Sequence, residues 1–120
     1  MIYTSYFSKT KKILEMGLRP VAITAGKPKF FNGEHFGEVG PQRPLLNDYK
    51  NGIINEEQYT EIYNKFLEYN KEEIISIVKE RYISGNVVFL CYEGPGKFCH
   101  RHLLSEFLNK NNIKCEELKI

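Results

Sequence analysis

The richest set of chemically versatile side chains in this sequence lies within residues 91–101. Two cysteines and a histidine there could supply nucleophiles or carry protons, and Glu93 could act as a general base. Arg101 and the first turn of a following helix would add positive charge that suits a phosphate or a carboxylate. The stretch therefore predicts a site for a small anion, with Glu93 and Cys99 as the candidate catalytic residues.

Each of these side chains also has a simpler interpretation. Cys91 ends an apolar run and can be a small buried filler rather than a reactive thiol. Cys99 stands at a helix start, where the helix dipole and His100 would favour the thiolate, although a capping role explains it equally well. Glu93 could accept a proton or bind a ribose hydroxyl. The simplest role for Glu93 is a charge-assisted hydrogen bond to Arg101.

The cysteines and histidines do not have the usual spacing of a zinc site. The residues concerned are Cys91, Cys99, His100, His102 and Cys115. Residues 94–97 also fall short of a phosphate-binding loop, because Phe98 follows the lysine where Ser or Thr is required. We therefore expect neither a metal nor a cofactor. Three cysteines at irregular spacing are no disulfide framework, so free thiols are expected.

A sheet is needed to position these residues, and the sequence predicts one. Val87–Cys91 is a continuous apolar run bounded by turn residues, which is typical of a central strand buried on both faces. Residues 1–7 and 19–24 predict two further strands, because they are rich in β-branched and aromatic side chains. Apolar and polar side chains alternate sufficiently over residues 113–120 to predict a last strand, at the edge of the sheet.

Helices should cover this sheet. Asn55 begins a capping-box signature ahead of apolar residues at helical spacing, and Asn70 repeats the cap before a second helix. Shorter helices are predicted over 8–17 and 100–108. Residues 25–52 show no periodicity but contain several aromatic residues, so we interpret them as a loop or lid beside the site.

The order of these elements favours one three-layer α/β domain over residues 1–120. It would have about four mostly parallel strands with helices on both faces, as in Rossmann-like folds. Ligands of such sheets bind beyond the carboxyl ends of the strands. This rule, together with the aromatic rings available to stack on a planar ligand group, gives the candidate ligand-binding residues Tyr6, Ser8, Thr24, Phe31, Tyr59, Tyr63, Cys91, Tyr92, Phe98, His100 and Arg101.

The composition gives no support to several classes of partner. The formal net charge of +2 is too small to indicate nucleic acid or an anionic membrane surface. Lysines cluster at residues 9–12 and 27–29, but a solvated face explains both clusters. No apolar run approaches the roughly 20 residues that span a bilayer, and the amino terminus lacks a secretory signal pattern. We expect a cytoplasmic protein, and the sequence does not decide whether it forms an oligomer.

Residues 87–104 closely resemble the signature of the domain-of-unknown-function 488 family. In that signature a strand ends in Leu-Cys-x-Glu, and Cys-His-Arg opens a helix after a short turn. Residues 3–7, Gly40 with Pro41, and Tyr59 with Tyr63 agree with further landmarks of the family. Where many relatives carry an acidic residue and an arginine after the second strand, this chain has residues 24–28. The residues of this chain that match the signature position by position are Cys91, Glu93, Cys99, His100 and Arg101.

The resemblance implies an α/β domain whose pocket binds or acts on nucleotides or modified nucleic-acid components. We therefore expect a small anionic, nucleotide-like ligand, with Arg101 at its phosphate. If the domain is an enzyme, Glu93 would activate water at a glycosidic carbon, as a hydrolase or glycosidase does. Without turnover, the pocket would sense or sequester the ligand. The alternatives are a Cys-dependent enzyme acting through Cys99 and a nucleic-acid-binding module.

Overall fold

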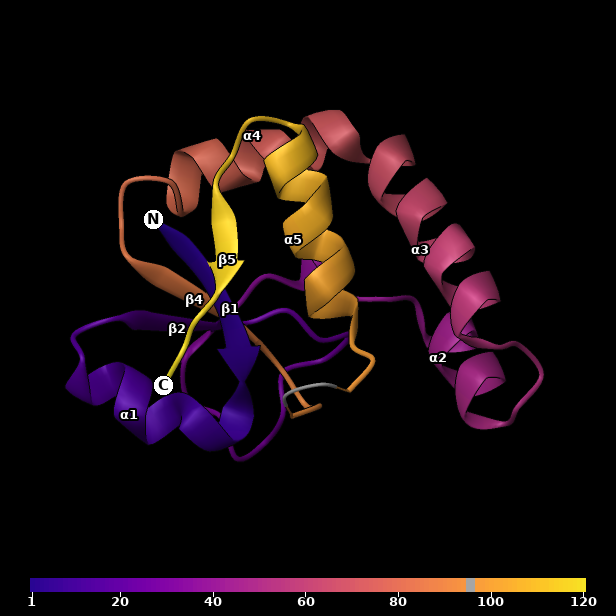
Figure 1. Cartoon of the computed structure of the whole chain (residues 1–120), viewed down its shortest axis with the longest axis horizontal. Helices are drawn as coiled ribbons and strands as arrows, with labels where there is room; N and C mark the ends of the chain where they lie inside the picture. Colours follow the sequence, from indigo (N-terminus) through magenta and orange to yellow (C-terminus); the bar gives the residue numbers. More distant parts are fainter. Residues whose placement is uncertain (95–96) are drawn as a thin grey trace.

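The computed structural model describes residues 1–94 and 97–120, and their strands form one five-stranded parallel sheet (Figure 1). The spatial order of the strands is β3-β2-β4-β1-β5, and every neighbouring pair is parallel. The α/β class expected from the sequence is thereby confirmed. The strands are β1 (Ile2–Tyr6), β2 (Arg19–Ala22), β3 (Glu34–His35), β4 (Val87–Cys91) and β5 (Cys115–Glu117).

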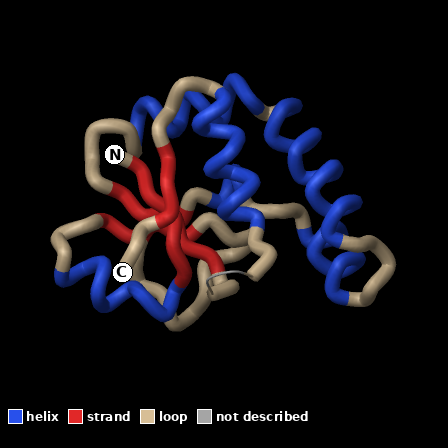
Figure 2. Tube along the Cα trace, viewed as in Figure 1, coloured by secondary structure: helices blue, strands red, loops and turns tan. Residues whose placement is uncertain are grey.

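Helices cover both faces of the sheet, which gives the three expected layers. Figure 2 shows α1 on one side of the strands and α4 and α5 on the other. α3 packs beside α5, and α2 packs against α3, so these helices extend the molecule beyond the sheet. The helices are α1 (Thr10–Glu15), α2 (Arg43–Lys50), α3 (Glu56–Tyr69), α4 (Lys71–Arg81) and α5 (His100–Lys110).

β4 is the buried strand that its apolar run predicts. It lies between β2 and β1, and all five of its residues are buried. Val88 and Leu90 pack with Ile13 of α1, whereas Phe89 and Cys91 belong to the larger core beneath α3, α4 and α5. The alternation of side chains along a strand therefore supplies both layers of the core from one run.

The two predicted caps differ in the structure. Asn55 forms a complete capping box with Gln58, in which its Oδ1 accepts from the Gln58 backbone N–H at 2.8 Å. Asn70 makes no such cap for α4. Its side-chain amide donates instead to the carbonyl of Phe66 at 2.9 Å, so it satisfies the end of α3 rather than the start of α4. The cap predicted at Asn70 is therefore wrong, although the helix is present.

Residues 25–52 contain more regular structure than the predicted loop. They include β3, a short 3-10 helix (Gly37–Val39) and α2. Pro44 is compatible with α2 because it lies in the first turn, where backbone N–H groups have no partner inside the helix. The helix predicted from residue 8 begins at Thr10, after a 3-10 turn (Phe7–Lys9).

Residues 94–97, which fall short of the phosphate-binding loop pattern, include Pro95 and Gly96, and these two lie outside the described residues. Within the described ranges, no helix combines the length and apolar character needed to cross a membrane.

Candidate functional site

A cavity of about 760 Å³ lies beyond the carboxyl ends of β2 and β4. Residues 24–29 line it after β2, and residues 91–93 line it at the end of β4. The first residues of α5, one face of α2 and Tyr59 of α3 complete its walls. Its volume lies within the range of small-molecule sites, and its position follows the strand-end rule for parallel sheets.

Positive charge predominates among the ionisable side chains of the lining. Lys27 and Lys29 follow β2, and Arg43 and Lys50 come from α2, whereas Glu93 is the carboxylate in the described lining. The Arg43 guanidinium lies so close to Gly26 that a Cβ there would be 3.1 Å from Nη2. The charges of α2 and of the loop after β2 therefore converge on one space.

Three aromatic rings form one wall of the cavity. The ring centroids of Tyr49 and Phe98 are 5.5 Å apart, and Tyr59 lies 5.1 Å from Phe98 and 5.3 Å from Tyr49. Burial raises the pKa of Tyr59, so this phenol stays neutral and can only act as a hydrogen-bonding or apolar group. Tyr49 and Phe98 are only partly buried, which leaves ring surface toward the cavity.

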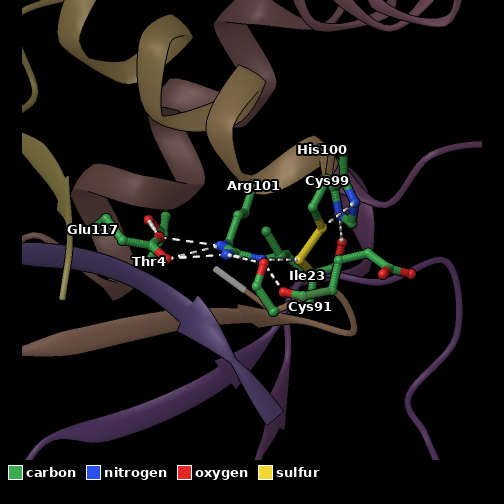
Figure 3. The surroundings of a disulfide bond; sticks show 9 residues. Thr4, Ile23, Cys91, Cys99, His100, Arg101 and Glu117 are labelled. Atoms are coloured by element: carbon green, nitrogen blue, oxygen red, sulfur yellow. Dashed lines mark hydrogen bonds and ion pairs between the residues drawn. A yellow bond between two sulfur atoms is a disulfide. The ribbon is translucent and has the colours of Figure 1, made fainter. Parts of the chain in front are cut away.

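The end of β4 and the start of α5 bring two cysteines together (Figure 3). Cys91 is the last residue of β4, and Cys99 is the N-cap of α5, with extended backbone geometry. The structure joins them in a disulfide, whereas Cys115 is free and buried. Free thiols at Cys91 and Cys99 are therefore a wrong prediction for this structure. The two cysteines are eight residues apart in the sequence, and their contact depends on the fold, so spacing alone could not predict it.

His100 is held in one orientation beside the two sulfurs. Its Nε2 lies 2.6 Å from the backbone carbonyl oxygen of Ile23, and its Nδ1 lies 3.8 Å from Cys99 Sγ. Burial, with a smaller contribution from the charge of Arg101, lowers the pKa of His100 to about 4. The ring is thus neutral near pH 7. Because a carbonyl only accepts, Nε2 carries the proton and Nδ1 keeps its lone pair.

Arg101 lies away from the cavity, in contrast to the sequence prediction. It is fully buried and points toward β5, where Nη2 donates to Glu117 Oε2 at 3.0 Å. Nη1 donates to Cys91 Sγ at 3.1 Å and to the backbone oxygen of Glu93. The sequence analysis expected Arg101 to contact a ligand phosphate, and the structure instead directs this side chain toward β5. Glu117, rather than the carboxylate of Glu93, neutralises its charge.

Four other candidates also lie outside the cavity. Tyr6 lies against the Arg101 guanidinium, with 5.5 Å between Cζ and the ring centroid, and lines a separate cavity of about 220 Å³. Tyr63 is buried and donates to the Val39 carbonyl at 2.6 Å. Phe31 packs on an aromatic neighbour beneath α1, and Ser8 is exposed. The candidates that do line the cavity are Thr24, Tyr59, Cys91, Tyr92, Glu93, Phe98, Cys99 and His100.

Sequence reasoning missed the contribution of α2. Arg43, Tyr49 and Lys50 line the cavity from a helix that shows too short a periodic pattern to be recognised. For Lys27 and Lys29 the sequence favours a solvated face, although the strand-end rule also points to residues 24–29. Their position directly after a β-strand was the available signal, because loops at strand carboxyl ends converge on one site.

One comparison with known proteins gives a match. Residues 10–112 match the family model described as the active DUF488-N3 subclade, so the match covers most of the chain. No curated protein and no solved structure matches the chain.

Proposed function

The chain belongs to the DUF488 family, and from that premise we propose that its cavity binds a small anionic ligand of the nucleotide type. The observation that carries the proposal is the composition of the lining, where four cationic side chains accompany a single carboxylate among the residues that the structure describes. Clustered like charges in a concave, partly apolar site raise the local concentration of anions. Arg43 and Lys27 are suited to the phosphate groups, Arg43 through paired hydrogen bonds.

The aromatic wall supports the nucleotide part of the proposal. The partly exposed rings of Tyr49 and Phe98 offer faces on which a purine or pyrimidine can stack, and such stacking contributes about 1–3 kcal/mol per base. Glu93 lines the same cavity and can accept hydrogen bonds from a ribose or from the edge of a base. Charge for the phosphate, a ring for the base and an acceptor for the sugar thus occur in one space.

The test is calorimetric titration of the protein with AMP, ADP and ADP-ribose. Arg43→Gln should raise the dissociation constant about tenfold, since a hydrogen bond to a charged group contributes about 1.5–3 kcal/mol. Lys110→Gln is the matched control, because it also removes one exposed positive charge. Lys110 lies at the far end of α5, about 15 Å along the helix axis from the cavity.

Two results would oppose the proposal. One is the absence of heat with every probe at millimolar concentration. The other is an equal loss of affinity in the Arg43 and Lys110 variants, which would indicate general attraction rather than a site.

Hydrolysis is the second candidate function, because Glu93 lies in the cavity with its backbone fixed by Arg101. The Glu93 carboxylate would take a proton from a water molecule that attacks the glycosidic carbon. The titrated samples can be analysed chromatographically for released base. Release that Glu93→Gln abolishes while binding persists would indicate an enzyme. Intact ligand in the wild-type sample would indicate a binding or sequestering protein.

A further inference from the structure

Three buried side chains at the cavity wall form a set of potential metal ligands. Cys91 Sγ, Cys99 Sγ and a ring nitrogen of His100 all lie within 4.8 Å of one another. The end of β4 and the first turn of α5 supply them, so rigid elements fix all three positions. All three residues also line the cavity. A metal ion held by them would therefore have a coordination position facing the ligand space.

The hydrogen bonding of His100 is that of a metal-ligating imidazole. Such histidines almost always donate one ring N–H to a carbonyl or carboxylate, which orients the ring and fixes its tautomer. The contact of Nε2 with the Ile23 carbonyl at 2.6 Å meets this description. It leaves the unprotonated Nδ1 facing Cys99 Sγ.

The backbone separation of the two cysteines would allow both sulfurs to bind one ion after the disulfide is reduced. Their Cα atoms are 7.2 Å apart, beyond the roughly 4.4–6.8 Å that disulfides usually span. Two thiolates held at that separation could both reach a divalent cation.

The charges around the sulfurs would balance if two thiolates bound a divalent cation. Two thiolates would neutralise a divalent ion, and the Glu117 carboxylate neutralises Arg101. Arg101 Nη1 donates to Cys91 Sγ at 3.1 Å, so the hydrogen bond holds this sulfur in place beside the cluster.

We propose that in the reduced protein Cys91, Cys99 and His100 bind one Zn²⁺ ion, whose fourth position opens into the cavity. A thiol reductant supplies the two electrons and two protons that convert the disulfide into two thiols. Zinc binding then releases both thiol protons. Two sulfurs and one imidazole suit zinc, and three protein ligands with an open position are typical of catalytic rather than structural zinc sites. This inference goes beyond the proposed function, because it needs no nucleotide.

The experiment uses Co²⁺ as a spectroscopic probe of the full chain. The protein is reduced, freed of reductant under nitrogen and titrated with Co²⁺. We expect tetrahedral ligand-field bands and a sulfur-to-cobalt charge-transfer band that saturate at one ion per chain, and we expect Zn²⁺ to abolish them. Absence of the charge-transfer band would overturn the proposal.

The variants locate the ion. Cys99→Ser should weaken cobalt binding by more than the ~10- to 100-fold that loss of an outer-shell contact costs. Serine is a good N-cap, so this variant is expected to fold, and circular dichroism checks that it does. Cys115→Ser is the matched control, because Cys115 is buried but lies outside the cluster. Equal loss of binding in both variants would place the ion elsewhere and refute the assignment.

A thiol count shows whether reduction has succeeded. It is made in denaturant, because burial raises the pKa of Cys115 to about 11 and slows labelling of the folded chain. Three reactive thiols are expected after reduction. A persistent count of one, under conditions that reduce ordinary protein disulfides, would also overturn the proposal, since the ligands would not form.

Discussion

A guanidinium can be buried only where acceptors surround it, and Arg101 meets that condition. Glu117 accepts from Nε and Nη2, and Cys91 Sγ accepts from Nη1. The backbone oxygens of Glu93 and Gly94 accept further hydrogen bonds. Arg101 thus ties the end of β4 to β5. This arrangement fixes the shape of the cavity wall without touching the cavity.

The contrast between two arginines gives a prediction at this scale. Arg101→Lys should lower the free energy of unfolding by about 2–4 kcal/mol, because a single ammonium cannot serve the acceptors of a buried guanidinium. Arg43→Lys makes the same chemical change at an exposed position and should change stability by less than about 0.5 kcal/mol. Urea unfolding monitored by circular dichroism measures both. Equal effects would show that Arg101 is not a structural residue.

At the scale of elements, the two asparagines ahead of α3 and α4 provide a second prediction. Asn55→Ala should cost about 1 kcal/mol, because it removes a complete capping box. Asn70→Ala should cost less, since the Asn70 side chain leaves the N-terminal N–H groups of α4 uncapped and bonds only the end of α3. Thermal unfolding of the two variants compares them. A larger loss for Asn70→Ala would contradict the different roles.

The elements that sequence could predict are those with a long or uninterrupted pattern. β4 has five consecutive apolar residues, and α3 has a capping box and several turns of periodic residues. α2 has eight residues, of which only Leu45 is buried, so its stability depends on packing against α3. β3 spans two residues and exists through its pairing with β2. Tertiary contacts of this kind leave no local signal.

The residues of the site also separate into those that the sequence could place and those that it could not. The strand-end rule was enough to place Thr24, Cys91 and Glu93 at the cavity. It could not orient Arg101, because the direction of that side chain depends on Glu117, which the pairing of β5 with β1 brings within reach.

At the scale of the whole molecule, Gly40 sets how closely two distant segments approach. A Cβ at this position would lie 2.6 Å from the Thr24 carbonyl oxygen, so only glycine allows the segment before α2 to touch the loop after β2. The backbone φ of −66° suits any residue, which makes the restriction purely steric. The contact holds α2, with Arg43, over the cavity.

Gly40→Ala should therefore destabilise the fold by about 1–3 kcal/mol, as overpacking typically does, and should also weaken binding of the nucleotide probes. Gly94→Ala is the control, because none of the residues that the structure describes lies within 4 Å of its added Cβ. Chemical unfolding and calorimetry report the two effects. Unchanged stability and affinity in Gly40→Ala would show that the segments can separate at no cost.

The pairing of β5 with β1 has a consequence for synthesis on the ribosome. β1 is translated before the other four strands of the sheet, yet both of its neighbours, β4 and β5, come from the last third of residues 1–120. Glu117 of β5 then accepts from both Thr4 and Arg101. The nascent chain therefore cannot complete the surroundings of Cys91 until β5 has left the exit tunnel, and β1 lacks one of its two neighbouring strands until then.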